Sequence, residues 1–283
     1  MSKIAIVTDS SCDLPLELVE KYDIKIVPLR VIYEKEEYRD GVDIQPQEVL
    51  DRLEEEIPKT SLPDSGEILD LFDRLSEKGY TDAICIALSS KLSGTYNLMR
   101  LLAEEYDQSI MKIQVIDAKT LSVILGLIVL EAAKKVKQGE DTEAIIDTIY
   151  KTREKIFGCY VIKTLKYLKK GGRIGRVEGT VGELLDIKPI IGVDDDGIYY
   201  TINKTRGRKK SVQKMKELFE EKFKGKTINM AVINAGAWDE AEELLSYAKS
   251  IADVRESFIS HLSPALGVHT GKGMLGLSAF CVK

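Results

Sequence analysis

The sequence predicts an α/β protein in which a mostly parallel, doubly wound sheet is followed by an α+β domain with a mixed sheet. In the first half, apolar strand-like runs alternate with helical patterns, which is typical of a parallel sheet with crossover helices. In the second half, Asp194-Asp195-Asp196-Gly197 separates two apolar runs and indicates a hairpin. The pattern changes near residue 158, and 283 residues are enough for two cores. We therefore expect domains over residues 1–158 and 159–283.

In the first half, the spacing of apolar residues and the residue types at helix ends predict the elements in order. Apolar runs predict strands over residues 3–8, 24–33, 82–88 and 112–116. Helical spacing predicts helices over residues 15–22, 46–56, 121–136 and 142–157, with two more beginning near residues 65 and 93. The charged residues 34–43 predict a loop or lid, and the prolines within residues 58–65 predict an exposed turn. The helix over 121–136 is apolar nearly all round at its start, so we expect it to be buried or to line an apolar cavity.

The second half mixes the hairpin with crossover connections. Its strand-like runs cover residues 160–163, 188–193, 198–203, 228–234, 254–260 and 274–282. Its helical patterns cover residues 164–170, 209–223 and 239–251. This mixture is what predicts the α+β domain.

The charge is mild overall and uneven along the chain. The net charge of −5 does not suggest a nucleic-acid-binding protein, but residues 163–210 hold 12 Lys and Arg against 6 Asp and Glu. This basic window favours an anionic partner. Aromatic residues are not interleaved with the basic ones, so we expect no nucleic acid among the partners.

Several classes of protein are disfavoured by motifs that the sequence lacks. The four cysteines form no C-x-x-C pair, so neither zinc nor a redox pair is indicated. There is no G-x-S-x-G elbow, Walker A motif, G-x-G-x-x-G after the first strand, or H-E-x-x-H, and we expect no metal and no cofactor. The longest apolar run, residues 123–130, is much shorter than the roughly 20 residues that span a membrane. The N-terminal apolar run is too short for a signal peptide, and we expect a soluble, cytoplasmic protein.

The first candidate site follows the strand over residues 82–88, where hydroxyl-rich residues lead into a helix. Ser93 is placed as the helix N-cap, and Gly94 allows the backbone to come close to a ligand. Free N–H groups beside Ser and Thr hydroxyls suit a carboxylate or a phosphate. The alternative is that Ser93 only caps its own helix.

A second candidate is His269, in the glycine-rich stretch Gly267-Val268-His269-Thr270-Gly271, which we expect to be a loop. A histidine there can meet a ligand, and a Ser93–His269 pair could be a nucleophile and its base. A hydroxyl, a glycine and a histidine around a carboxylate would give the same pattern without catalysis. The basic residues 171–176 and 206–210 are either solvated or in contact with phosphate.

Five motifs in order resemble the DegV family over the whole chain. They are Val7-Thr8-Asp9-Ser10, Lys59-Thr60-Ser61-x-Pro63, Leu92-Ser93-Gly94-Thr95-Tyr96, Gly171-Gly172-Arg173-Ile174 and Gly267-x-His269-Thr270-Gly271. The resemblance implies a bacterial fatty-acid carrier with two α/β domains, which buries one long acyl chain and holds its carboxylate near the surface. In members with a fatty-acid kinase partner, the carboxylate is phosphorylated to an acyl-phosphate that enters phospholipid synthesis.

The resemblance also implies roles for residues at matching positions. Thr60, Ser61 and Ser93 would hold the carboxylate, with Gly94 and Thr95 in the same loop and His269 close by. Arg173 and Arg206 would face the kinase, and the helix from residue 121 would line the tail pocket. Transient contact with a membrane is compatible with such a carrier.

This sequence departs from the family pattern at three positions near the expected head group. Leu62 and Asp64 replace the usual Gln and Ser, and Lys272 replaces the usual Pro. An aspartate near the carboxylate would repel it, and a lysine would attract it.

Three functions remain open from the sequence. The first is non-catalytic binding of a long-chain fatty acid. The second is an acyl hydrolase or transferase that uses Ser93 and His269. The third is binding of a small phosphorylated metabolite at the same loops.

Overall fold

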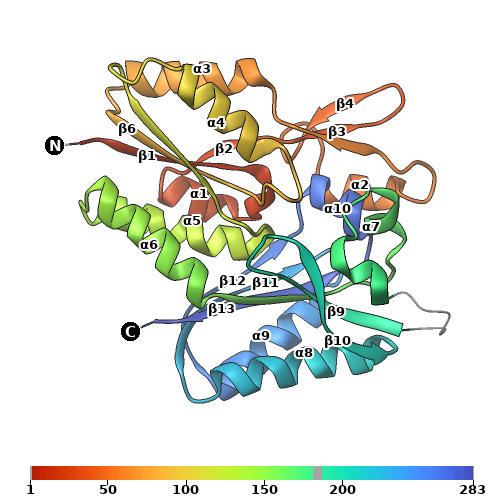
Figure 1. Ribbon diagram of the computed structural model, residues 1–283. Coiled ribbons are helices and arrows are strands. Elements are labelled where there is room, and N and C mark those ends of the chain that lie inside the picture. Colours follow the sequence, from red (N-terminus) through yellow and green to blue (C-terminus); the bar gives the residue numbers. More distant parts are fainter. Residues whose placement is uncertain (1, 181–186, 283) are drawn as a thin grey trace.

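The computed structural model describes residues 2–180 and 187–282, with no side-chain description for Thr180. Two sheets and the helices between and outside them form stacked layers (Figure 1). Helices α3 (Ser65–Glu77) and α4 (Thr95–Glu105) form one outer layer, and α8 (Arg208–Phe223) and α9 (Trp238–Ile251) form the other.

The first sheet has four parallel strands in the order β2-β1-β6-β7, as the alternating pattern predicts. The strands are β1 (Ile4–Asp9), β2 (Lys25–Val27), β6 (Asp82–Ala87) and β7 (Lys112–Asp117). Residues such as Val7 and Cys85 pack with α3 and α4, whereas Ile6 and Ile84 belong to the cluster on the opposite face. Because both faces are covered, the strands are apolar without alternation.

The second sheet has six strands in the order β10-β9-β8-β13-β11-β12 and is mixed, as expected. Among the described strands of this sheet, β11 and β12 alone pair in parallel, and the other pairs are antiparallel. The strands are β8 (Phe157–Val161), β9 (Ile187–Val193), β10 (Tyr199–Arg206), β11 (Thr227–Asn234), β12 (Asp253–His261) and β13 (Leu275–Cys281). The hairpin predicted at Asp194–Gly197 joins β9 to β10 and is confirmed.

Helix α5 (Ser122–Lys137) lies between the two sheets, beside α6 (Thr142–Lys155). It contacts β1 of the first sheet and both β11 and β13 of the second. This position buries Val123 to Leu130 completely and explains why the helix is apolar nearly all round. The two halves therefore share one hydrophobic cluster, and the division at residue 158, which lies inside β8, stays a prediction.

Three predictions between residues 24 and 65 are wrong. The single strand expected over 24–33 is divided at Pro28 into β2 and β3 (Arg30–Ile32), because proline cannot continue the ladder. The expected loop over 34–43 contains β4 (Glu37–Arg39), and the expected turn over 58–65 contains β5 (Lys59–Ser61). These short strands form a separate antiparallel sheet in the order β4-β3-β5, in which β3 and β4 form a local hairpin and β5 joins β3 from a more distant part of the sequence.

The shorter helices complete the fold. They are α1 (Leu16–Lys21), α2 (Pro46–Arg52), α7 (Lys166–Lys170), α10 (Pro264–Thr270) and the 3₁₀ turns η1 (Ser10–Cys12) and η2 (Gly175–Thr180). The expected loop around His269 is wrong, because His269 is in α10. Pro264 in the first turn and Gly271 at φ 73° just after the last residue are the usual helix boundaries, and they could have been read from the sequence.

Within residues 2–180 and 187–282, no helix has the length and apolar character needed to cross a membrane. The same residues contain no group of three or more His, Cys, Asp or Glu side chains arranged to hold a metal ion.

Candidate functional site

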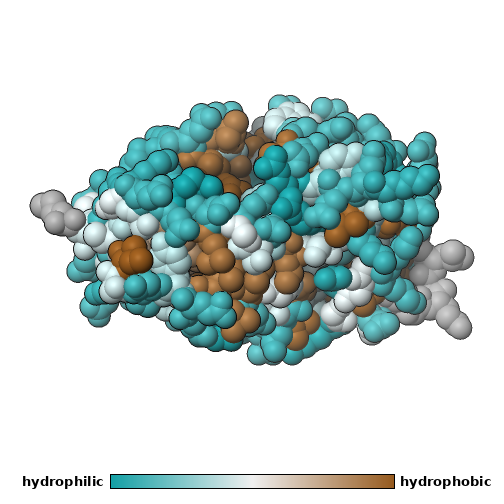
Figure 2. All heavy atoms as spheres, turned by 90° about the horizontal axis from the view of Figure 1, so that it is seen from above, coloured by the Kyte–Doolittle hydropathy of each residue, from teal (hydrophilic) through white to brown (hydrophobic). Residues whose placement is uncertain are grey.

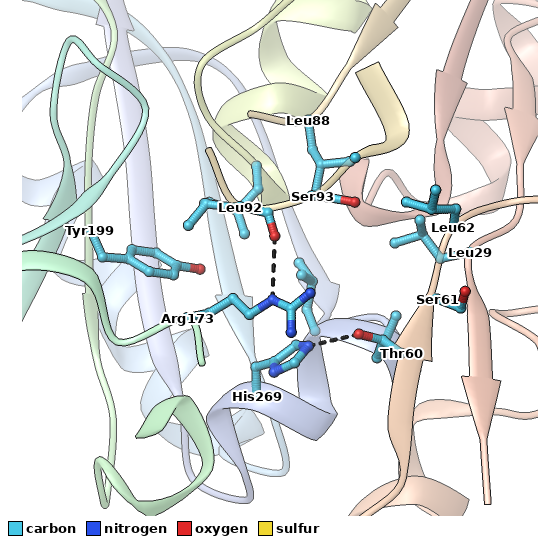
Figure 3. Close-up of a pocket in the computed structure, with 14 residues that line it drawn as sticks. Leu29, Thr60, Ser61, Leu62, Leu88, Leu92, Ser93, Arg173, Tyr199 and His269 are labelled. Carbon is cyan, nitrogen blue, oxygen red and sulfur yellow. Dashed lines mark hydrogen bonds between the residues drawn. The ribbon is translucent and has the colours of Figure 1, made fainter. Parts of the chain in front are cut away.

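A cavity of about 200 Å³ lies where the small sheet, the loop after β6 and helix α10 meet (Figure 3). Its lining combines hydroxyl groups, one guanidinium and one imidazole with apolar side chains. The lining residues are Leu29, Thr60, Ser61, Leu62, Leu88, Leu92, Ser93, Gly94, Leu121, Arg173, Tyr199, Ala265, Leu266 and His269.

The structure brings together most of the residues predicted to bind a ligand. Thr60 and Ser61 come from β5, Ser93 and Gly94 from the loop before α4, and His269 from α10. Thr95 is the exception, because it is fully buried and does not line the cavity. Its Oγ1 is 2.9 Å from Ser93 Oγ, so it orients the serine hydroxyl from behind.

Ser93 is not the helix N-cap that the sequence predicts. Gly94 occupies that position and α4 begins at Thr95, although Ser93 Oγ still accepts a hydrogen bond from the Thr95 amide at 3.3 Å. Gly94 is closely approached by Leu62, since a Cβ at Gly94 would be 3.3 Å from Leu62 Cδ2. Both loop residues line the cavity.

His269 and Thr60 are in direct contact at the cavity wall, with Nε2 and Oγ1 2.9 Å apart. Burial, together with the positive charge of Arg173, lowers the pKa of His269 to about 4. The imidazole is therefore neutral at neutral pH. Its Nδ1 is buried and has no hydrogen-bond partner within the described residues.

The structure explains why the first residue of the Gly-Gly-Arg motif, Gly171, is a glycine. A Cβ at Gly171 would be only 2.2 Å from His269 Nδ1, a distance that no real contact allows. The backbone of this loop therefore packs directly against the imidazole ring. We infer that residue 171 must be glycine for α10 and the basic loop to approach this closely.

Arg173 lines the cavity instead of pointing away from it. Its Nε donates to the Leu92 carbonyl at 3.4 Å and its Nη1 to the Gly171 carbonyl at 2.5 Å. Its charge thus faces the hydroxyl groups, a placement that the sequence did not reveal. Arg206, the other predicted partner contact, is exposed at the end of β10 and does not line the cavity.

Ser93 and His269 do not form a nucleophile–base pair in this structure. The Ser93 hydroxyl bonds to Thr95, and His269 Nε2 bonds to Thr60. General-base activation needs a direct hydrogen bond between the two side chains, or one bridging water. The arrangement is suited to holding a ligand.

A second, smaller cavity of about 20 Å³ adjoins the first and shares Leu121, Tyr199 and Leu266 with it. Its other lining residues are mostly apolar: Ser122, Tyr160, Ile162, Leu168, Ile191, Leu262, Thr270 and Met274. Of the long helix expected to line a tail pocket, the start at Leu121 and Ser122 lines these two cavities, and the role of the rest of the helix stays a prediction. The sequence also missed Tyr199 and Leu266, which lie at the junction.

The three departures from the family pattern fall mostly outside the cavity. Leu62 lines it, whereas Asp64 caps α3 by accepting from the Glu67 amide at 3.1 Å. The ammonium of Lys272 lies 4.0 Å from Asp51 Oδ1 and is largely exposed. Neither Asp64 nor Lys272 lines the cavity.

Comparison with known proteins places this geometry in a family. A family model described as "Uncharacterised protein, DegV family" matches residues 3–281. A DegV domain-containing protein of Clostridium acetobutylicum is 42% identical over 280 residues, which are 99% of each chain.

Three solved structures have folds similar to that of this chain. A fatty-acid-binding DegV family protein from Thermus thermophilus has a TM-score of 0.91 at 29% identity, covering 99% of this chain and 100% of that one. Bacillus subtilis DegV, described as a fatty acid binding protein, has a TM-score of 0.90 at 28% identity with 100% of both chains covered. A stearic acid-binding protein from Eubacterium ventriosum has a TM-score of 0.85 at 27% identity, covering 99% and 98%. From its sequence match and its fold, this chain belongs to the DegV family.

Proposed function

We propose that this protein binds one long-chain fatty acid and does not itself transform it. The observation that carries the proposal is a cavity whose lining has hydroxyls and a guanidinium and whose far end continues into apolar space. The fatty-acid binding described for its structural relatives supports the same assignment.

The polar lining residues suit a carboxylate. Thr60, Ser61 and Ser93 offer hydroxyl donors, and Arg173 supplies a positive charge that faces them. Hydrogen bonds to an ionised oxygen are about twice as strong as neutral ones. Because His269 is neutral, Arg173 is the group that balances the ligand's charge.

The acyl tail would run past Leu121, Tyr199 and Leu266 into the second cavity. At about 20 Å³ that space holds about one water molecule, so these side chains must move apart to admit a tail. Burial of each methylene contributes about 0.8 kcal/mol, which is enough over a long chain to offset that rearrangement.

The finer part of the proposal is presentation of the carboxylate to a fatty-acid kinase, which would form an acyl-phosphate for phospholipid synthesis. The basic window with exposed Arg206 supports an anionic partner surface. We also propose a cytoplasmic location with transient membrane contact. Apolar side chains gather on the face viewed in Figure 2, and Leu62, which is 37% exposed, joins the cavity to the surface.

Titration of the delipidated protein with palmitate and with its methyl ester tests this function. We expect palmitate to bind at least about tenfold more tightly, because only the acid carries the charge that Arg173 and the hydroxyls hold. Equal binding of the two would contradict the site. Hydrolysis of the ester that disappears in Ser93→Ala would instead support the acyl hydrolase, and preference for a small phosphorylated compound would support the third function.

The kinase part needs a separate assay. With a bacterial fatty-acid kinase and ATP, we expect acyl-phosphate formation to fall in Arg206→Glu while palmitate affinity stays unchanged. Lys226→Glu, at an exposed basic residue outside the basic window of residues 163–210, is the control. Formation of acyl-phosphate that is equal in all three proteins would contradict this role of Arg206.

A further inference from the structure

Helix α10 belongs to the second half of the chain, but the first half holds it at both ends. Asp13 Oδ1 accepts a hydrogen bond from the Ser263 amide at 2.8 Å, and Asp40 Oδ1 accepts one from the Ala265 amide at 2.9 Å. At the other end of the helix, His269 bonds to Thr60. These partners are 250, 225 and 209 residues apart in the sequence.

The two carboxyl groups accept hydrogen bonds from amides at the start of α10, as a capping side chain normally does. Ser263, the residue before the helix, makes no side-chain cap, and its buried Oγ has no partner within the described residues. Pro264 has no N–H group. The Ser263 and Ala265 amides would be buried without an acceptor if Asp13 and Asp40 were absent, and each such loss is costly.

The acceptors are themselves fixed by the first half. Asp13 Oδ2 accepts from Ser122 Oγ at 2.6 Å, and Asp40 Oδ2 accepts from Ser10 Oγ at 2.5 Å. Asp13 is 6% exposed and Asp40 is 2% exposed, so no solvent competes for these bonds. Each carboxyl group thus connects a fixed hydroxyl of the first half to an amide of α10.

The helix that is held in this way forms part of the cavity wall. Ala265, whose amide is anchored, and its neighbour Leu266 line the cavity, and His269 lines it one turn later. A shift of α10 along its axis would therefore move the apolar wall and the imidazole together.

We propose that Asp13 and Asp40 are positioning residues that set the place of α10, and hence of Leu266 and His269, relative to Thr60 in the wall of the ligand cavity. The effect on fatty-acid affinity rests on the proposed function, whereas the effect on His269 does not.

The chain contains a matched control. Asp9 is fully buried and, like Asp13 and Asp40, is a hydrogen-bond acceptor. Its three donors are the Ser11 amide, the Ser11 hydroxyl and the Leu88 amide. All three donors belong to the first half. Asp9→Asn therefore perturbs a buried carboxyl group of the same kind without touching α10.

The experiment is nitrogen-15 NMR of the His269 imidazole, with the Thr60→Val variant as the reference for a broken Thr60–His269 bond. His261, the other histidine of the chain, is removed by His261→Gln in every sample. We expect the Nε2 resonance in Asp40→Ala to move toward the Thr60→Val position and palmitate affinity to fall about tenfold. Asp40→Asn keeps an oxygen acceptor for the Ala265 amide. It should therefore leave the Nε2 resonance near its wild-type position and retain palmitate affinity to within about threefold. Asp9→Asn should leave the resonance in place.

The proposal is overturned if Asp40→Ala leaves the His269 resonance at its wild-type position, or if Asp9→Asn moves it equally. Should Asp40→Ala fail to fold, Ser10→Ala loosens the same carboxyl group and should move the resonance in the same direction; no movement there would overturn the proposal. Wild-type protein that binds no palmitate would contradict the proposed function, while the NMR result would still decide the positioning role.

Discussion

Thr60 and His269, 209 residues apart in the sequence, are joined by a 2.9 Å hydrogen bond that closes the ligand cavity between β5 and α10. One residue comes from a three-residue strand and the other from a seven-residue helix. The contact therefore reports whether the two halves of the chain are correctly placed around the cavity.

Replacement of Thr60 by valine keeps the shape of the side chain and removes the hydroxyl. His269 Nε2 then has no partner, and a carboxylate in the cavity loses one donor. We expect palmitate affinity to fall by about 1–2 kcal/mol, measured by calorimetric titration. Thr148→Val, which removes a hydroxyl bonded to the Ala144 carbonyl in α6 and away from the cavity lining, is the control. Equal affinity in Thr60→Val and wild type would remove Thr60 from the site.

Ser93→Ala removes a hydroxyl that lines the cavity and that Thr95 orients. We expect affinity for palmitate to fall by about 1–3 kcal/mol, because a buried carboxylate is left short of a donor. Ser90→Ala, in the same loop but outside the cavity lining, should bind as the wild type does. An identical loss in both variants would point to disturbance of the loop instead of a lost ligand contact.

Gly171→Ala forces a Cβ to within 2.2 Å of His269 Nδ1 unless the chain shifts. We expect the free energy of unfolding to fall by about 1–3 kcal/mol, as for other cases of overpacking, and palmitate affinity to fall with it. Gly179→Ala is the control, because no atom lies within 4 Å of its added Cβ. Denaturant titrations in which both variants match the wild type would show that the loop can retreat freely from the histidine.

The buried carboxyl group of Asp13 predicts a particular dependence of stability on pH. Burial raises its pKa from 3.8 to about 8, despite the hydrogen bonds from Ser122 and Ser263. Between those values the folded state holds a proton that the unfolded chain releases, so the free energy of unfolding falls as pH rises. The lowered pKa of His269, about 4 against 6.5, acts in the opposite direction and only below pH 6.5.

Between pH 6.5 and 8, comparison of the wild type with Asp13→Asn isolates the contribution of Asp13. We expect the wild type to lose up to about 2 kcal/mol of unfolding free energy across that window relative to Asp13→Asn, which cannot ionise. Urea titrations at several pH values measure the difference. Parallel pH profiles for the two proteins would mean that Asp13 does not change protonation there.

The sequence alone predicts those parts of the structure that depend on a local residue pattern. The parallel sheet, the hairpin at Asp194–Gly197 and the loop bearing Ser93 were all predictable, because period and turn residues specify them. β5 and α10 were missed because each is short and gains its stability from partners distant in sequence. Arg173 was assigned to a partner surface because nothing in a Gly-Gly-Arg motif indicates which way the side chain points.

The central claim is that a lipid acid occupies the cavity, and extraction of the protein from its native cells tests it most directly. Mass spectrometry of the extract should find one long-chain fatty acid per chain, with less of it in protein carrying Thr60→Val and Ser93→Ala together. A stoichiometric phosphorylated metabolite, or a fatty acid content unchanged by that double substitution, would contradict the account.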